Sequence, residues 1–577
     1  MSTLNKMDPK DQRNTPPSAT GGPGFNTTST TSQLQVLPTQ SVSTSPIPLP
    51  DKTEREGYYY GLFSRPLLLA RTSRTTWALP VGPYNYPERK VLKNVSNHKI
   101  MDKWDDAMAM EVFGILETYS VQWTTVELFR IGSEEQKDIP VVLWIGVRPG
   151  TLTDEDGASL PAAGIVALAC KRALEKHNIL DVECEIKECN VYRGAGPVLA
   201  RPSTSWDPTE AVDIEVFFTP TIGTCIAPED QTREGTFGFY VTFPEHPGKV
   251  YGVTCRHVLL PPVEQENKTY HHNDLSQPPR LVVLPGDGFL DILRQRAVRE
   301  GKSMTYITES CRRTLDDLAE HEDQDALRAK KHAQGRMERA QQTIGDFDRL
   351  VKDLDTTWKT LESRVVGHVA YAPPIRADNK SHNYTLDWCL YEVDPMKIKN
   401  FAGNVIDLGY RSDEMAAIFY RAMNPSTKNS YEFEYPFDRQ WPIRDMCIPL
   451  DEMKHPKTFG KDGTPAILVV KRGRTTGVTC GIANEIDSYV RTYLPDASSY
   501  ISKEWAILGL DESNSPFSAL GDSGSLVVDA QGRMGGMLTG GSGFSRGIGI
   551  TYATPMVALL ADMEKCGWRQ PNTSVAP

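Results

Sequence analysis

The sequence has few cysteines for its length and arranges none of them as a Cys-x-x-Cys pair. Ten cysteines occur among 577 residues, which fits neither a small disulfide scaffold nor a zinc module. Phosphate-binding motifs are also missing, since no Gly-x-x-x-x-Gly-Lys loop and no strand-linked Gly-x-Gly-x-x-Gly is present. We therefore expect reduced core thiols, no metal and no cofactor.

Long apolar runs and an excess of positive charge are lacking as well. No uninterrupted apolar stretch approaches the roughly 18 residues of a spanning helix, and the start carries Asp and Lys rather than a basic end followed by an apolar run. The net charge of -11 and pI of about 5.6 argue against a nucleic-acid partner. We expect no membrane association and an intracellular, cytoplasmic location, with the nucleus not excluded.

What is present is ordinary globular composition, with 39% hydrophobic and 24% charged residues. The length predicts several domains. Residues 1–55 are rich in Ser, Thr, Pro and Gly and nearly free of aromatics, so we predict a disordered tail. The remaining divisions are a domain over 56–205, a larger one over 206–568 and a C-terminal tail over 569–577.

The domain over 56–205 mixes helical and strand patterns, so it is predicted to be a small α/β or α+β domain. Its role stays open, because none of its segments carries a known motif. The segments are two helices, Met101 to Leu116 and Ala162 to Lys176, and three strands, Thr124 to Ile131, Val141 to Val147 and Val182 to Ile186.

After residue 206 short strands and turns predominate, but a highly charged stretch interrupts them between about 286 and 366. Apolar residues there recur in steps of three and four, which predicts an antiparallel helical hairpin joined near 321–325. Packing of its two helices on each other, or self-association or partner binding through them, is favoured. The alternative is that the second helix packs on the barrel as an ordinary amphipathic helix.

The strongest motif is the Gly-Asp-Ser-Gly loop at 521–524, followed at once by a buried strand. Small flanking residues let a substrate backbone approach the hydroxyl of Ser523. They also let the N–H groups of Gly521 and Ser523 point together at a developing oxyanion.

A serine needs a base, and the base needs a carboxylate that holds its tautomer. His257 follows a strand in a Thr-x-x-His-Val context, and Asp387 stands at the start of an alternating strand. Asp394 is a rival carboxylate on the same stretch. We predict that His257, Asp387 and Ser523 form the triad.

These motifs resemble those of chymotrypsin-like (trypsin-like) serine proteases, whose triad has the same chain order of His, Asp and Ser. Residues 473–477, Gly-Arg-Thr-Thr-Gly, look like the start of the second barrel in alpha-lytic and streptogrisin-type enzymes. The resemblance covers about 206–568 and implies an all-β double barrel into which the helical hairpin is inserted.

Further roles follow from the resemblance alone. It implies an ion pair between Arg474 and Asp522, and binding of an extended substrate to the backbone of Thr539, Gly540 and Gly541 by strand addition. The implied function is intracellular serine endopeptidase, acting on a peptide or protein through an acyl-enzyme. The alternative is a catalytically silent protease-fold adaptor that binds partners through its N-terminal domain or helical hairpin.

Overall fold

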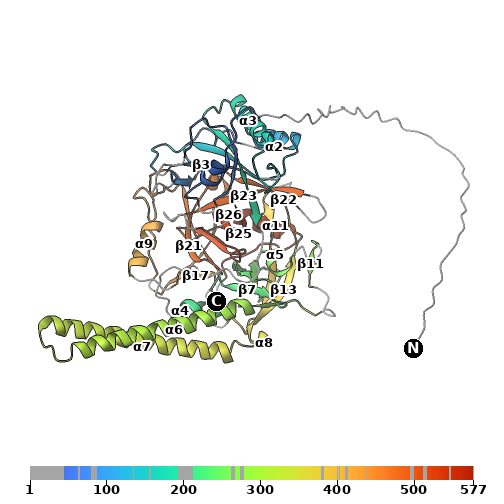
Figure 1. The fold of residues 1–577 in the computed structure, drawn as a ribbon. Coiled ribbons are helices and arrows are strands. Elements are labelled where there is room, and N and C mark those ends of the chain that lie inside the picture. Colours follow the sequence, from blue (N-terminus) through green and yellow to red (C-terminus); the bar gives the residue numbers. More distant parts are fainter. Residues whose placement is uncertain are drawn as a thin grey trace, which may run out of the picture. The chain divides into compact units, whose positions relative to one another are not determined.

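The computed structural model describes most of the chain after residue 44. The described ranges are 45–62, 65–78, 87–104, 106–133, 135–154, 157–192, 212–261, 267–272, 278–377, 383–398, 401, 403–409, 413–436, 438–493, 499–510, 516–544 and 547–575. Within them the protein is a mixed α/β structure built on large β-sheets (Figure 1). None of the helices in these ranges is sufficiently long and apolar to cross a bilayer.

The larger sheet has 14 strands and extends through both halves of the chain. Its main order is β1-β5-β4-β3-β22-β23-β21-β20-β24-β25-β19, with β2 on β3, β26 on β23 and β25, and β6 on β25. These strands are β1 (Leu68–Arg71), β2 (Lys90–Lys93), β3 (Trp123–Ser133), β4 (Val141–Val147), β5 (Glu183–Glu188), β6 (Asn190–Tyr192), β19 (Arg444–Cys447), β20 (Ile467–Gly473), β21 (Gly477–Ala483), β22 (Ser488–Tyr493), β23 (Ser499–Gly509), β24 (Leu526–Asp529), β25 (Arg533–Phe544) and β26 (Gly547–Pro555).

A second sheet of eight strands has the order β8-β7-β12-β13-β16-β10-β9, with β11 on β13, and two short strand pairs complete the β structure. The strands of this sheet are β7 (Cys225–Pro228), β8 (Gly235–Thr236), β9 (Phe239–Val241), β10 (Tyr251–Thr254), β11 (Tyr270–His271), β12 (Leu281–Val283), β13 (Val365–Ala372) and β16 (Cys389–Val393). The two pairs are β14 (Arg376–Ala377) with β15 (Thr385–Leu386) and β17 (Val405–Asp407) with β18 (Gln440–Pro442).

Helices cover the sheets and form the insertion. They are α1 (Lys52–Gly57), α2 (Asp106–Thr118), α3 (Pro161–Lys176), α4 (Val212–Glu215), α5 (Arg256–Leu259), α6 (Asp287–Asp317), α7 (Gln324–Thr356), α8 (Leu361–Arg364), α9 (Asp413–Met423), α10 (Leu450–Lys454) and α11 (Met556–Lys565), with a 3-10 turn at Val216–Phe218.

Strand β4 explains how the N-terminal part of the chain is attached. All seven of its residues are buried. Val141, Leu143 and Ile145 face a cluster that contains residues of α2 and α3, whereas Val142 and Trp144 face a cluster that contains residues of β23 and β26. A strand covered on both faces is apolar throughout, and this run is.

The sheet itself joins the segments on either side of residue 205. Strand β3 pairs antiparallel with β22, with Tyr489 opposite Val126 and Val490 opposite Thr125. The described residues from 45 onward belong to one compact unit. The part of 56–205 that the structure describes is therefore built into the same sheet as the C-terminal part.

The predicted boundary of the disordered tail, residue 55, lies too far along the chain. Ile47 and Leu49 pack against the cluster beneath α2 and α3. Helix α1 begins at Lys52, capped by Asp51, whose carboxylate accepts the N–H of Glu54 at 2.8 Å. Two apolar side chains and a capped turn order residues 45–55 despite their polar composition, while residues 1–44 lie outside the described ranges.

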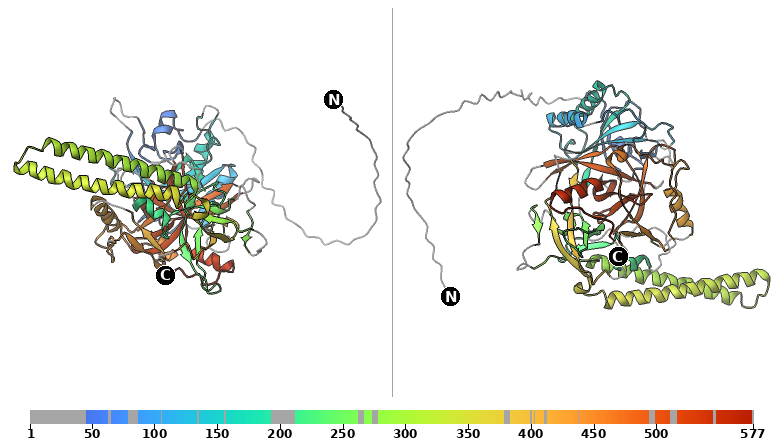
Figure 2. Two further views of the ribbon diagram at one scale, coloured as in Figure 1. Left: turned by 90° about the horizontal axis from the view of Figure 1, so that it is seen from below. Right: turned by 180° about the vertical axis from the view of Figure 1, so that it is seen from behind.

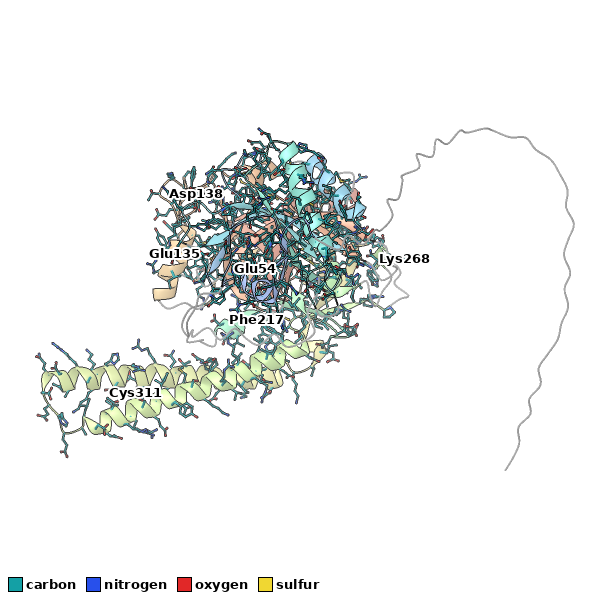
Figure 3. All side chains as sticks on the ribbon, turned by 45° about the horizontal axis from the view of Figure 1, so that its top comes forward. Glu54, Glu135, Asp138, Phe217, Lys268 and Cys311 are labelled. Carbon is teal, nitrogen blue, oxygen red and sulfur yellow. The ribbon has the colours of Figure 1, made fainter. Side chains whose placement is uncertain are left out.

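The expected helical hairpin is present, with its turn at residues 318–323, slightly earlier than predicted. Helices α6 and α7 lie side by side (Figures 1 and 2). The inner ends of both helices pack on the body, where Phe289, Leu293, Phe347 and Leu354 share a cluster with Phe217. Figure 3 places Phe217 at this junction and Cys311 farther along the hairpin.

Self-packing and packing on the body therefore both occur, each in a different part of the second helix. Toward the tip of α7 the buried positions are alanines seven residues apart, Ala326, Ala333 and Ala340. Such a repeat keeps one narrow face against the partner helix. The larger apolar residues of α7 are concentrated at its inner end.

Candidate active site

His257 is held just beyond the end of a strand. Strand β10 ends at Thr254, and the short helix α5 follows, with Cys255 in extended conformation as its N-cap. Strands β10 and β16 pair antiparallel with Thr254 opposite Cys389. This register brings the residues just after Thr254 and just before Cys389 to the same end of the two strands, and these include His257 and Asp387.

The contact between His257 and Asp387 is close and buried. Asp387 Oδ2 lies 2.5 Å from His257 Nδ1, and Asp387 Oδ1 accepts the backbone N–H of His257 at 3.1 Å. The two residues are 4% and 1% exposed, respectively. With Nδ1 bonded to the carboxylate, Nε2 is the nitrogen left to act on a substrate or nucleophile. The rival Asp394 instead accepts the N–H of Met396.

The Ser523 loop reaches the same region through a relay of hydrogen bonds. The backbone N–H of Thr236 donates to the Ser523 carbonyl at 2.8 Å, and the Thr236 hydroxyl donates to the Gly521 carbonyl at 2.9 Å. The hydroxyl of Thr254 in turn donates to the Thr236 carbonyl at 2.7 Å. Strand β8 thus fixes the Ser523 loop to β10, the strand that leads into the helix with His257.

Gly524 is required for this close approach. Its φ is +97°, and a Cβ at this position would lie 2.2 Å from the carbonyl oxygen of Thr236 and 2.4 Å from the Thr254 hydroxyl oxygen. Only glycine fits both the conformation and the space. A side chain here would push the Ser523 loop away from β8 and β10.

The two atoms that a triad would join are both unpaired. His257 Nε2 is buried and has no hydrogen-bond partner among the described residues. Ser523 is 4% exposed, and its hydroxyl likewise makes no hydrogen bond within that part of the chain. Hydrogen bonds between nucleophile and base are often long in the absence of substrate.

The predicted oxyanion donors are also unused. Within the described ranges no acceptor takes the backbone N–H of Gly521 or of Ser523, whereas Asp522, Gly524 and Ser525 all donate within the loop or to Leu538. Gly521 has a φ of +98°. Two free N–H groups that flank one buried turn are suited to binding a negatively charged oxygen.

The predicted ion pair between Arg474 and Asp522 is wrong. Arg474 pairs with the buried Glu234. The cation next to Asp522 is Lys471, with Nζ 3.5 Å from Oδ2, and both side chains are completely buried. Arg474 instead donates its backbone N–H to the Thr236 hydroxyl at 3.0 Å, so it supports the relay from the other side.

Asp522 is further stabilised by four donors from its surroundings. Its carboxylate accepts the N–H groups of Thr475, Thr476 and Ala519 and the hydroxyl of Thr476, at 2.6 to 3.2 Å. Burial lowers the pKa of Lys471, and the charge of Asp522 opposes that shift. The sequence motifs do not identify Lys471 as the partner of Asp522; the signal available was a lysine that directly follows the apolar run 467–470.

The predicted substrate-binding residues lie on β25, next to the Ser523 loop. The Leu538 carbonyl accepts the Gly524 N–H at 2.8 Å, and Thr539, Gly540 and Gly541 follow directly. Gly541 pairs with Thr551 of β26 on one side and with Tyr192 of β6 on the other. The structure thus brings these residues beside the Ser523 loop, with the edge of Gly541 already occupied by β6.

Phe517, six residues before Ser523, is a core side chain. It is 2% exposed and packs with Ile507 and Val527. The Lys471 Nζ lies 5.6 Å from the centre of its ring. The ring therefore contributes to the environment that buries the Lys471–Asp522 pair.

Cys255, His257 and Asp387 are the one group of potential metal ligands that the described residues bring together, with ligand atoms within 4.8 Å of one another. Both carboxylate oxygens of Asp387 are already bonded to His257. The Cys255 thiol donates to the Leu538 carbonyl at 3.3 Å. A metal ion would have to break these bonds, so the donor set fits a hydrogen-bonded dyad better than a metal centre. None of the ten cysteines, which all lie in the described ranges, is joined in a disulfide, and seven are buried.

No known protein-family model matches the chain, and no curated protein is significantly similar to it.

Proposed function

We propose that the protein is a serine endopeptidase with a chymotrypsin-like double β-barrel over about 206–568. The observation that carries the proposal is the buried Asp387 carboxylate bonded to both the backbone N–H and Nδ1 of His257. This arrangement fixes the tautomer in which Nε2 can accept a proton, and it stabilises the imidazolium that results.

Each residue has a defined part in the reaction. His257 Nε2 removes the proton of the Ser523 hydroxyl, whose oxygen attacks the carbonyl carbon of the substrate. The N–H groups of Gly521 and Ser523 bind the resulting oxyanion. His257 then protonates the leaving amine, and water hydrolyses the acyl-enzyme by the same steps in reverse order.

The Ser523 loop can be stabilised without an amino terminus that is created by proteolysis. Asp522 is neutralised by the internal Lys471 and bound by four further donors. The oxyanion loop is thereby stabilised by residues of the continuous chain. The full-length protein should therefore be active without N-terminal processing by another enzyme.

The test is hydrolysis of a peptide library by the purified full-length protein, read by mass spectrometry. The control variant is Ser310→Ala, because Ser310 is exposed on α6. The proposal is supported if the wild type and this control cleave peptides and Ser523→Ala does not. If Ser523→Ala cleaves as well as the wild type, Ser523 is not the nucleophile. If neither protein cleaves any peptide while both are folded, the adaptor function is favoured.

A further inference from the structure

Strand β6 occupies the edge of β25 on the side where the Ser523 loop lies. Strand β26 pairs with the other edge of β25 along its length, from Gly536 opposite Pro555 to Phe544 opposite Gly547. The edge facing the Ser523 loop is used in turn by β24, by the loop itself at Leu538, and by β6 at residues 541–543.

On this edge of β25, two residues lie between the part that pairs with β6 and the part that is bonded to the Ser523 loop. Within the described ranges no strand pairs with Thr539 or Gly540 on this side. At one end of the gap, Leu538 is bonded to Gly524 and Ser525, the two residues that follow Ser523. At the other end, Gly541 is opposite Tyr192.

The direction of β6 points the chain toward Ser523. The pairing is antiparallel, with Asn190 opposite Gly543, Val191 opposite Ser542 and Tyr192 opposite Gly541. Each further residue of β6 therefore advances one position toward Leu538. A strand continued in this register would place its next two residues opposite Gly540 and Thr539, and the residues that come next in the sequence are Arg193 and Gly194.

The start of β6 is fixed by buried contacts. The N–H of Cys189 donates to the Val147 carbonyl at 2.8 Å, and the Cys189 carbonyl accepts the Thr124 hydroxyl at 3.1 Å. Cys189 is 1% exposed. These contacts anchor the chain to β3 and β4 immediately before it crosses to β25, so its approach to the active site is set by the core.

We propose that the segment following Tyr192 is the enzyme's own substrate, cut in cis by Ser523. The bond cut is one of those that join Arg193, Gly194, Ala195 and Gly196. This inference rests on the proposed function and names a substrate for the same site.

The reaction is an ordinary hydrolysis and needs no further reagent than water. The Ser523 oxygen bonds to the carbonyl carbon, and the amide C–N bond breaks as His257 delivers the serine proton to the leaving nitrogen. Water then adds to the ester and restores the serine hydroxyl. One peptide bond and one water molecule become a carboxylic acid and an amine.

The two products should remain together after the cut. Strand β3 stays paired with β22, the Asn94 amide donates to the Glu485 carboxylate at 2.6 Å, and the Val95 N–H donates to the Asn484 side chain at 3.2 Å. A cut after Tyr192 breaks none of these contacts. The native particle should keep its size while the denatured chain separates into two pieces.

The experiment compares the wild type, Ser523→Ala and their equimolar mixture by denaturing mass spectrometry of the full-length chains. We expect the wild type as two chains whose ends meet between residues 193 and 196, and Ser523→Ala as one chain. Ser523→Ala should remain intact in the mixture, because the cut is intramolecular. Cleavage of Ser523→Ala at the same bond, alone or by added wild type, would overturn the proposal.

Two further variants and one label distinguish a failure of self-cleavage from a failure of the proposed endopeptidase function. Replacing Gly194 and Ala195 with proline should leave the chain intact, whereas the same change at Ser203 and Thr204 should not. A wild type that is intact but modified at Ser523 by a fluorophosphonate would refute self-cleavage and leave the endopeptidase proposal standing. A folded wild type that is intact and unmodified would refute both.

Discussion

Lys471 Nζ lies 3.5 Å from Asp522 Oδ2, and no part of either side chain is exposed to solvent. Lys471 belongs to β20, and Asp522 immediately precedes Ser523 in the chain. The pair therefore ties the Ser523 loop to the core of the larger sheet. Thr475 and Thr476 bind the same carboxylate from the turn between β20 and β21.

Lys471→Met should destabilise the protein by about 3 to 5 kcal/mol, because removing one partner of a buried pair leaves an uncompensated charge. The free energy of unfolding in urea is the measurement. Lys302→Met, an exposed change on α6, should alter stability by less than about 0.5 kcal/mol. Equal stability of the two variants would mean that the Lys471–Asp522 pair contributes little.

Asp387→Asn should lower the turnover of a peptide substrate by about 10⁴-fold, because an amide no longer holds His257 in the productive tautomer. The fold should persist, since the amide can occupy the same space. The measurement is kcat for Asp387→Asn and for Asp394→Asn, since the carboxylate of Asp394 accepts the N–H of Met396. A comparable loss in both variants would argue against the assignment of Asp387.

Gly521→Ala should reduce kcat by about 10²- to 10³-fold, the effect of losing one oxyanion donor. Gly521 has a φ of +98°, and an added Cβ would lie 2.6 Å from the Thr475 hydroxyl oxygen. The backbone at residue 521 must rotate to relieve both the unfavourable φ and the short contact. Gly335→Ala on α7, where nothing lies within 4 Å of the added carbon, should leave kcat unchanged. An unchanged kcat in Gly521→Ala would exclude its N–H from catalysis.

Glu485 should make the attachment of the N-terminal segment sensitive to pH. Burial raises the pKa of Glu485 to about 7, and its hydrogen bond with Asn94 opposes the shift. A carboxyl group whose pKa is raised on folding favours the folded state at low pH. That contribution is lost as the pH rises from the unfolded pKa, about 4.3, through the folded one.

Glu485→Gln should therefore be more stable than the wild type at pH 8, by about 1 to 3 kcal/mol, and the difference should shrink toward pH 5. Urea unfolding at a series of pH values measures it. Glu175→Gln, an exposed change on α3, should show no such trend. A difference that stays constant from pH 5 to pH 8 would contradict the raised pKa.

The sequence was sufficient to predict contacts that local motifs specify. His257 and Asp387 each stand at a strand end within a recognisable pattern, and the pairing of those strands brings them together. The helices and strands of 56–205 were also recognisable, since periodicity follows burial. The pairing of β3 with β22 could not be predicted in this way, because pairing between strands that are distant in the sequence does not change the local pattern of residues.

The error over Arg474 has a similar cause. A motif gives the residue type and its place in the turn, but the direction of a long side chain depends on which charge lies nearest in three dimensions. Glu234, far away in the sequence, supplies that charge. Its other carboxylate oxygen accepts the N–H of Phe289 at 2.8 Å, so Arg474 is linked to the start of α6.

The most direct measurement of the central claim is the reaction of the native protein with a fluorophosphonate, followed by peptide mapping of the adduct. If His257 activates Ser523, the adduct forms on Ser523 in the wild type, and its rate falls by orders of magnitude in His257→Ala. A folded wild type that forms no adduct at Ser523, or one that reacts as fast without the imidazole, would contradict the account.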